Sequence, residues 1–294
     1  MNHKAGFVNI IGNPNVGKST LMNRLVGEKI SIITSKSQTT RHRIKGIVNT
    51  DDYQIVYSDT PGVIKPSYKL QESMMNFSIS ALVDADVIIY VTDTVEKFDK
   101  NEAFLSKVQK TSAPVLLVIN KIDLSDDKKL EELFTRWEET LPNAIIYPIS
   151  AKENFNLDNL LNKIVELIPE GDPFFPKDEI TDLPARFFVN EIIREKILLN
   201  YDKEVPYSVE VQVEEFIDEP KIIRISAVIH VERESQKGII IGKRGEALKR
   251  VGTQARKDIE NFFGKKVFLQ VHVKLSKDWR SKEKNLQNFG YSNN

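Results

Sequence analysis

Short apolar runs alternate with helix-like stretches through the first 170 residues of the chain. The apolar runs are rich in Val, Ile and Leu at successive positions, which is typical of strands buried on both faces of a sheet. These strands are predicted at residues 7–11, 44–48, 54–57, 87–91, 115–119 and 145–149. Apolar positions at helical spacing predict helices at residues 18–26, 101–109, 126–140 and 157–168. The alternation predicts an α/β fold with a doubly wound, mostly parallel sheet that binds ligands at the carboxyl ends of its strands.

A proline-rich segment interrupts this alternation. Four prolines fall within the 16 residues from Pro169 to Pro184, and proline continues neither a helix nor a central strand. The pattern therefore predicts three parts, which are a first domain at residues 1–170, a linker at 171–184 and a second domain at 185–294.

The second domain follows a different pattern. An amphipathic helix is predicted at residues 185–199, and residues 209–213 alternate as a strand with one buried face does. Longer apolar runs predict strands at 222–231 and 267–275, and the helix between them spans 246–263. A small α+β domain is the expected result.

Composition and charge change this picture at a few points. The 294 residues include no cysteine, which excludes disulfides and thiolate metal sites. No apolar run approaches the roughly 20 residues that span a bilayer, and no secretory segment precedes the first strand, so a cytoplasmic protein is expected. The formal net charge is zero, yet residues 237–284 hold 14 Lys and Arg against 5 Asp and Glu. Such a basic stretch is usually a solvated face unless a motif lies within it.

The turn after the first predicted strand carries a complete phosphate-binding loop. Its glycines let backbone N–H groups close around phosphates, and the start of the following helix adds a positive dipole. Lys18 is expected to reach the β- and γ-phosphates, and Ser19 is expected to ligate Mg²⁺. The loop and its neighbour are Gly12, Asn13, Pro14, Asn15, Val16, Gly17, Lys18, Ser19 and Thr20.

Four further motifs fall in loops or at strand ends. Asp59-Thr60-Pro61-Gly62 follows the third strand, where Asp59 is expected to hold the magnesium shell and Gly62 to sense the γ-phosphate. Asn120-Lys121-Ile122-Asp123 ends the fifth strand, and the Asp123 carboxylate matches the N–H donors of guanine, which selects GTP over ATP. Ser150-Ala151-Lys152 is expected to cover the base, and Gln38-Thr39-Thr40-Arg41 to bring a threonine to Mg²⁺. The five motifs together predict an enzyme that binds and hydrolyses GTP.

A Gly-x-x-Gly sequence lies within the basic stretch. Ile241-Gly242-Lys243-Arg244-Gly245 follows an apolar run and opens the 246–263 helix, which is the arrangement of a KH domain that clamps single-stranded RNA. Lys249 and Arg250 add positive charge, and the apolar 239–241 edge is expected to form the floor under the bases. The order of helices and strands indicates the type II variant. On its own, the loop is equally compatible with an ordinary turn.

These motifs resemble those of translation-factor-class GTPases, and the phosphate loop together with Gln38–Arg41 is similar to the Era group. The likeness extends to the carboxyl-terminal tail, where Trp279 is expected to pack and the roles of Phe289 and Tyr291 stay open. The resemblance implies that Thr40, directly before the arginine, joins Ser19 and Asp59 as a magnesium ligand. It also implies a monomer that binds the 3′ end of 16S ribosomal RNA, not DNA, and assists assembly of the small (30S) ribosomal subunit. A peripheral contact with the inner face of the cell membrane is implied by the resemblance alone.

The position after Gly62 bears on catalysis. Many switch GTPases carry a glutamine there to orient water, and this chain has Val63, so slow intrinsic turnover is expected. In related potassium-activated GTPases an asparagine at the position of Asn15 holds K⁺. The candidate catalytic residues are therefore Asn15, together with Lys18 at the phosphates and Thr40 at Mg²⁺. One alternative is that Asn15 only shapes the loop, and another is that product release or closure of the Thr34–Arg43 loop sets the slow turnover. The protein is alternatively a nucleotide-responsive RNA chaperone or scaffold whose hydrolysis is incidental.

Overall fold

The computed structural model describes residues 3–96 and 101–291. The described chain divides into a first compact unit, which spans residues up to 67 and 71–182, and a second, which spans 68–70 and 183–291. Within the described residues, no helix is both long and apolar enough to cross a membrane.

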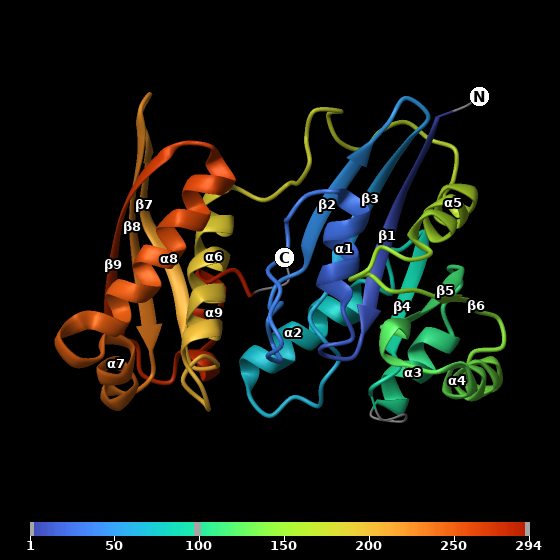
Figure 1. Ribbon diagram of the computed structural model, residues 1–294, viewed down its shortest axis with the longest axis horizontal. Helices are drawn as coiled ribbons and strands as arrows, with labels where there is room; N and C mark the ends of the chain where they lie inside the picture. The colour runs from blue at the N-terminus through green and yellow to red at the C-terminus, as the bar shows by residue number, and fades with distance from the viewer. Residues whose placement is uncertain (1–2, 97–100, 292–294) are drawn as a thin grey trace. The chain divides into compact units, whose positions relative to one another are not determined.

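The first unit is built on a six-stranded sheet in the order β2-β3-β1-β4-β5-β6 (Figure 1). Only β2 runs antiparallel to its neighbour, and the other adjacent pairs are parallel. All six strands lie where the apolar runs predict them, with ends that differ by a few residues. Their bounds are β1 Lys4–Gly12, β2 Ile44–Asn49, β3 Tyr53–Asp59, β4 Val87–Asp93, β5 Val115–Asn120 and β6 Ile145–Pro148.

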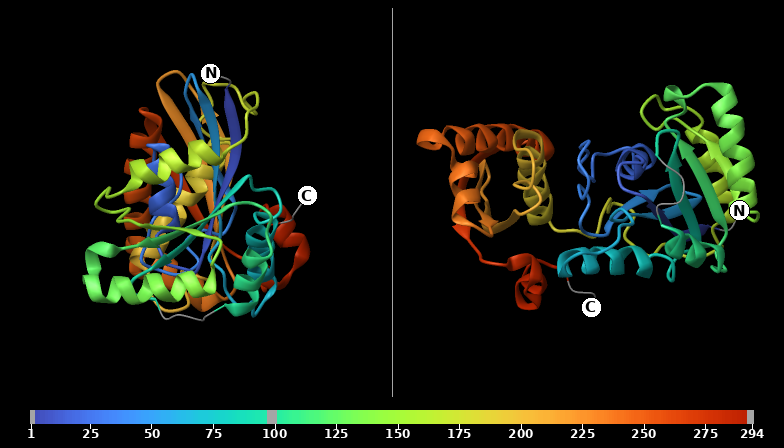
Figure 2. Two further views of the ribbon diagram at one scale, coloured as in Figure 1. Left: turned by 90° about the vertical axis from the view of Figure 1, so that its right-hand side faces the viewer. Right: turned by 90° about the horizontal axis from the view of Figure 1, so that it is seen from below.

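Helices cover both faces of this sheet (Figure 2). Side chains of α1 and α5 join the apolar cluster on one face, whereas α2, α3 and α4 pack on the other. The sequence pattern missed α2, because its buried positions Leu70, Met74 and Ser78 include a serine and follow a polar loop. The bounds are α1 Lys18–Val26, α2 Lys69–Ser80, α3 Glu102–Gln109, α4 Asp127–Thr140 and α5 Leu157–Leu167, with a 3₁₀ turn at Ile122–Leu124.

Residues 171–182, here called the strap, lie against the first unit along its edge strand β2. The Ile47 N–H donates to the Ile180 carbonyl over 2.9 Å, and Lys45 pairs with Asp182 at 2.8 Å. Gln54, which is fully buried on β3, accepts from the N–H groups of the two phenylalanines that begin the strap. Prolines therefore shape an ordered segment that carries the chain away from the first unit.

The second unit has helices on one face of a three-stranded sheet in the order β7-β8-β9. β7 and β8 are antiparallel, and β8 and β9 are parallel. The order α-β-β-α-α-β is that of a type II KH domain, as predicted. The elements are α6 Ala185–Asn200, β7 Glu210–Asp218, β8 Ile222–Val231, α7 Glu234–Ile241, α8 Glu246–Phe263, β9 Lys266–Leu275 and α9 Glu283–Asn288, with 3₁₀ turns at Lys243–Gly245 and Trp279–Ser281.

Two predictions for this unit need correction. The apolar 239–241 stretch is the end of helix α7 and not a strand-like edge, because Ile240 is buried in the core while Ile239 is half exposed. β7 also continues beyond residue 213 to Asp218. A bulge after Val213 shifts the alternation by one residue, and this hides the second half of the strand from a period-two pattern.

The carboxyl-terminal tail packs on the second unit. Trp279 is fully buried and donates through Nε1 to the Ser208 carbonyl over 2.9 Å. Tyr291 is also buried, and its hydroxyl donates to Glu210 over 2.6 Å. Phe289 packs edge-on against Trp279 with ring centroids 5.5 Å apart. The packing interpretation of Trp279 is confirmed, and it extends to the two aromatic residues that the sequence left open.

Candidate functional site

The phosphate loop connects β1 to α1 and depends on glycine at two close approaches. Gly12 has a φ of +151°, and a Cβ there would lie 2.1 Å from the carbonyl oxygen of Val91. Gly17 has a φ of +97°, and its Cβ would lie 2.2 Å from the Asn120 amide nitrogen. Any larger residue at either position would displace the loop from the strands behind it. Asn13 is held from the side by a 2.8 Å hydrogen bond to Glu96.

Lys18 is buried within this loop and is 6% exposed. Its ammonium group donates to the carbonyls of Gly12 and Asn13 over 3.0 and 2.8 Å. Burial lowers the pKa of Lys18 from 10.5 to about 8, and the nearby Asp59 carboxylate partly opposes this shift. A buried cation of this kind is suited to receive an anionic ligand.

Three side-chain oxygens meet beside Lys18, and we call them the oxygen triad. Ser19 Oγ donates to Asp59 Oδ2 over 2.6 Å, Thr40 Oγ1 donates to the same atom over 3.2 Å, and the two hydroxyls are 2.9 Å apart. Burial raises the pKa of Asp59, and Lys18 opposes this shift most strongly. Asp59 Oδ1 is buried without a hydrogen-bond partner among the described residues. An acceptor left unused beside two hydroxyls fits a hard divalent cation such as Mg²⁺.

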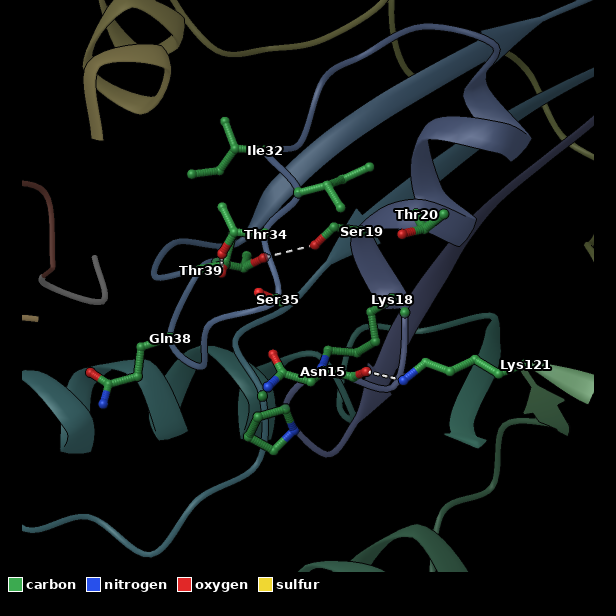
Figure 3. Close-up of a pocket in the computed structure, with 15 residues that line it drawn as sticks. Asn15, Lys18, Ser19, Thr20, Ile32, Thr34, Ser35, Gln38, Thr39 and Lys121 are labelled. Carbon is green, nitrogen blue, oxygen red and sulfur yellow. Dashed lines mark hydrogen bonds between the residues drawn. The ribbon is translucent and has the colours of Figure 1, made fainter. Parts of the chain in front are cut away.

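A cavity of about 390 Å³ opens next to the triad. Figure 3 shows Lys18 on one side and Thr34, Ser35 and Thr39 on the other. The sequence analysis predicted the phosphate loop and the Gln38–Arg41 motif here but gave no binding role to residues 32–35 of the facing loop. That loop has no period and few charges, so its only sequence signal is its place directly before the Thr40 motif. The lining residues outside the predicted motifs are Ile32, Ile33, Thr34 and Ser35.

The guanine motifs meet at the ends of β5 and β6. Asn120 donates to the Val16 carbonyl over 2.8 Å and accepts from the Ala151 N–H over 3.0 Å, so it ties the phosphate loop to the Ser150–Lys152 loop. Ser150 donates to Asp123 over 2.6 Å and thereby orients this exposed carboxylate. These contacts bring Asp123, Asn120 and the Ala151 amide together at the ends of the two strands, with the Ala151 N–H donated to Asn120.

Lys121 links the phosphate loop to the end of β4. Its ammonium group donates to the Asn15 carbonyl over 2.6 Å and pairs with Asp93 at 2.5 Å. Asn15 has a φ of +66°, lines the cavity and is exposed, whereas Lys152 lies at the surface beside Glu153. The aliphatic stem of Lys121 therefore borders the space between the phosphate loop and the base motifs.

The Asp59–Gly62 motif is held against the phosphate loop. Thr60 donates to the Ile10 carbonyl over 2.8 Å, and the Pro61 carbonyl accepts from Ser78 over 2.8 Å. A Cβ on Gly62 would lie 2.7 Å from Pro14, so only glycine permits this approach.

Val63 lies next to the phosphate loop, but its side chain is buried. Its side chain is 2% exposed and belongs to the apolar cluster beneath α3 and α4. Its N–H donates to the Gly12 carbonyl over 3.1 Å, and its carbonyl accepts from Asn101 over 3.0 Å. A buried valine side chain offers no hydrogen-bonding group to orient a water molecule.

The Gly-x-x-Gly loop lies between α7 and α8. Gly242, Arg244 and Gly245 all have positive φ values, of 71°, 52° and 79°. A Cβ on Gly242 would approach the Ala247 Cβ to 2.6 Å. Ile241 is half-buried at the end of α7. The positively charged side chains that the sequence assigned here are all exposed, namely Lys243, Arg244, Lys249 and Arg250.

Two family models match the chain. The model described as 50S ribosome-binding GTPase matches residues 7–121, and the model described as KH domain matches residues 204–280. GTPase Era of Alkaliphilus metalliredigens is 45% identical over 294 residues, which is 99% of this chain and 100% of that protein. GTPase Era of Staphylococcus haemolyticus is 43% identical over 291 residues, covering 98% of this chain and 97% of that protein.

Solved structures give the same result. Era in complex with MgGDPNP and nucleotides 1506–1542 of 16S ribosomal RNA is 40% identical and superposes with a TM-score of 0.94, covering 99% of this chain and 100% of that one. A variant of Aquifex aeolicus Era bound to GDP and AlF₄⁻ matches with the same identity, coverage and TM-score. Because relatives that carry one family name match this chain from one end to the other, the chain belongs to the Era family of GTPases.

Proposed function

We propose that the protein couples its GTPase activity to binding of the 3′ end of 16S ribosomal RNA, and so assists assembly of the small (30S) ribosomal subunit. The observation that carries the proposal is the oxygen triad, drawn from three separate segments beside the phosphate loop. A relative of nearly the same fold has been seen with MgGDPNP and a 16S RNA segment together. The division of labour follows the domains, with a GTPase domain at 1–170, a connection at 171–184 and a KH domain at 185–294.

In this proposal Ser19, Thr40 and Asp59 hold Mg²⁺, directly or through water. The ion supplies charge neutralisation to the β- and γ-phosphates when it is bound. Lys18 neutralises the same phosphates, and the Gly62 amide detects the γ-phosphate. Asp123 and the Ala151 amide read guanine, because a carboxylate accepts from its ring N–H and amine while an amide donates to its carbonyl. We place the protein in the cytoplasm, and a peripheral membrane contact rests on the family resemblance alone.

The RNA half of the proposal is tested by reversing the charge of the Gly-x-x-Gly loop. Replacing Lys243 and Arg244 with Asp should weaken binding of a single-stranded RNA from the 3′ end of 16S at least tenfold. Each lost phosphate contact should also reduce the slope of log affinity against log salt by about 0.7. The matched control replaces the exposed pair Lys128 and Lys129 of α4 with Asp. An unchanged slope in the loop variant, or an equal loss in the control, would contradict RNA binding through this loop.

We further propose that Asn15 holds a K⁺ ion that assists hydrolysis. Support comes from its exposed side chain at the cavity wall and from Val63, which leaves water without a glutamine partner. GTP turnover should be several-fold faster in KCl than in NaCl at equal ionic strength. Asn15→Ala should bring the potassium rate down to the sodium rate while GDP affinity stays the same. Equal rates in both salts for the unaltered protein would show that Asn15 only shapes the loop.

A further inference from the structure

Arg24 lies on α1, the helix whose first turn carries Lys18 and Ser19. Its guanidinium group reaches the opposite end of the nucleotide site. Nε donates to the Ala151 carbonyl over 3.2 Å, and Nη2 donates to the Lys152 carbonyl over 3.0 Å. One helix therefore contacts both the phosphate end of the site and the loop that covers the base.

The two carbonyls that Arg24 contacts belong to consecutive residues, so the contact holds the orientation of this loop as well as its position. A planar guanidinium presents its donors in a fixed fork, and two parallel hydrogen bonds hold both the place and the tilt of the peptides that they join. On the other side of the same loop, the Ala151 N–H donates to Asn120. This N–H is therefore engaged by Asn120, and a base carbonyl that enters beside Asn120 would share this donor or take it over.

We propose that Arg24 is a positioning residue for guanine recognition, which holds the Ala151 amide where it donates to the carbonyl at position 6 of the base. This inference rests on the proposed reading of guanine by Asp123 and Ala151. The simpler role of Arg24 is that of a cation in the last turn of a helix, where it complements the helix dipole. A lysine fulfils the dipole role equally well, but its single ammonium group does not reproduce the fork.

Nucleotide analogues separate the two edges of the base. In 6-thio-GDP a sulfur, which is a weak acceptor, replaces the oxygen that Ala151 would read. IDP keeps this oxygen and lacks the exocyclic amine that Asp123 would read. Dissociation constants of GDP, 6-thio-GDP and IDP are measured on the full-length chain for the unaltered protein and for the variants Arg24→Met, Arg24→Lys and Arg136→Met. Arg136 is an exposed arginine on α4 and serves as the matched control.

The unaltered protein should prefer GDP over 6-thio-GDP by about tenfold, the size expected for one lost hydrogen bond in a desolvated site. In Arg24→Met this preference should fall toward unity, whereas the preference for GDP over IDP should persist. Arg24→Lys should behave like Arg24→Met, and Arg136→Met like the unaltered protein.

An equal loss of affinity for all three nucleotides, or no change in any of them, would overturn the role of Arg24. Arg24→Lys keeps the charge and most of the stem, so it provides the comparison should the methionine variant fold poorly. A failure of the proposed guanine reading looks different, because the unaltered protein would then bind GDP and IDP equally well.

Discussion

Lys18 and Asp59 are ionisable groups of opposite charge that are both buried beneath the phosphate loop. Neither has the hydration that it would have at the surface, and the two pKa values respond in opposite directions. Burial lowers the pKa of Lys18 to about 8 and raises that of Asp59. An anion and a divalent cation bound here would replace the missing hydration, so ligand binding and protonation are linked.

The linkage can be measured for Lys18. Near pH 8 about half of the Lys18 groups in the free protein are neutral, since the pKa is about 8. Phosphates favour the charged form, so binding raises this pKa, and MgGDP binding at pH 8 should take up about half a proton. Calorimetry at pH 8 in buffers of different ionisation enthalpy measures the uptake. At pH 7 the uptake by this group should fall to about a tenth of a proton, and an uptake that does not increase with pH would contradict the assignment.

Motif spacing placed the residues that act through backbone geometry or a single charge, such as Lys18 and Asp123. It did not locate Arg24 or Gln54, although both hold segments that matter to the fold. Arg24 bonds a residue 127 positions away, and Gln54 bonds one 120 positions away. No local pattern encodes such a pair, because the partner groups are backbone atoms that every residue carries.

At the scale of elements, the strap is attached to β3 chiefly through one buried side chain. The Gln54 oxygen accepts from the N–H groups of Phe174 and Phe175 over 2.7 and 3.0 Å. Its nitrogen donates to Asn49 over 2.6 Å and to the Phe175 carbonyl over 2.8 Å. The ring of Phe174 also packs 4.6 Å from that of Phe7. All the hydrogen-bonding capacity of the Gln54 oxygen, and both protons of its amide, are therefore used.

Removing this side chain should be costly. Gln54→Ala leaves two N–H groups and a carbonyl of the strap without partners, and we expect a loss of about 2–3 kcal/mol in the free energy of unfolding of the first unit. Urea unfolding of the full-length chain, followed by a probe in that unit, measures the loss. Gln109→Ala is the control, since Gln109 is exposed and its side-chain amide donates to the Thr140 carbonyl. A loss no greater than that of the control would show that the strap is held by other contacts.

In this chain the apolar pattern predicted all six strands of the first unit, but it missed two helices, α2 and α7. The six strands of the first unit are continuous apolar runs because both faces of their sheet are covered. α2 escaped prediction because a serine occupies one of its buried positions, and α7 because three successive isoleucines carry no helical period. In both helices tertiary packing, rather than the local pattern, decides the structure.

At the scale of the whole molecule, the chain joins a nucleotide site to a basic loop on a separate unit. A switch requires that the nucleotide change the affinity for RNA, and a scaffold does not. Since a relative has been seen with a GTP analogue and RNA together, we expect the triphosphate state to favour RNA.

RNA affinity should be at least fivefold higher with MgGDPNP than with MgGDP, and RNA should raise MgGDPNP affinity relative to MgGDP by the same factor, because coupling between two sites is reciprocal. Fluorescence titrations in both directions on the full-length chain test this. Lys18→Ala, which should no longer bind nucleotide, is the control and should show one RNA affinity in all conditions. Indistinguishable affinities in the unaltered protein would favour the scaffold.

The strap also covers an exposed edge of the six-stranded sheet. β2 is an edge strand, and an uncovered edge is a template on which another chain can add a strand and begin to aggregate. Ile180 accepts from Ile47, and Thr181 donates to the Lys45 carbonyl over 2.8 Å, so part of this edge is occupied by the chain itself. A shortened protein that stopped at residue 170 would keep the phosphate loop and all the guanine motifs but expose the β2 edge. Extending it to Asp182 keeps the edge covered, and solubility therefore sets the practical end of an isolated GTPase domain about 15 residues beyond its last helix, which ends at Leu167.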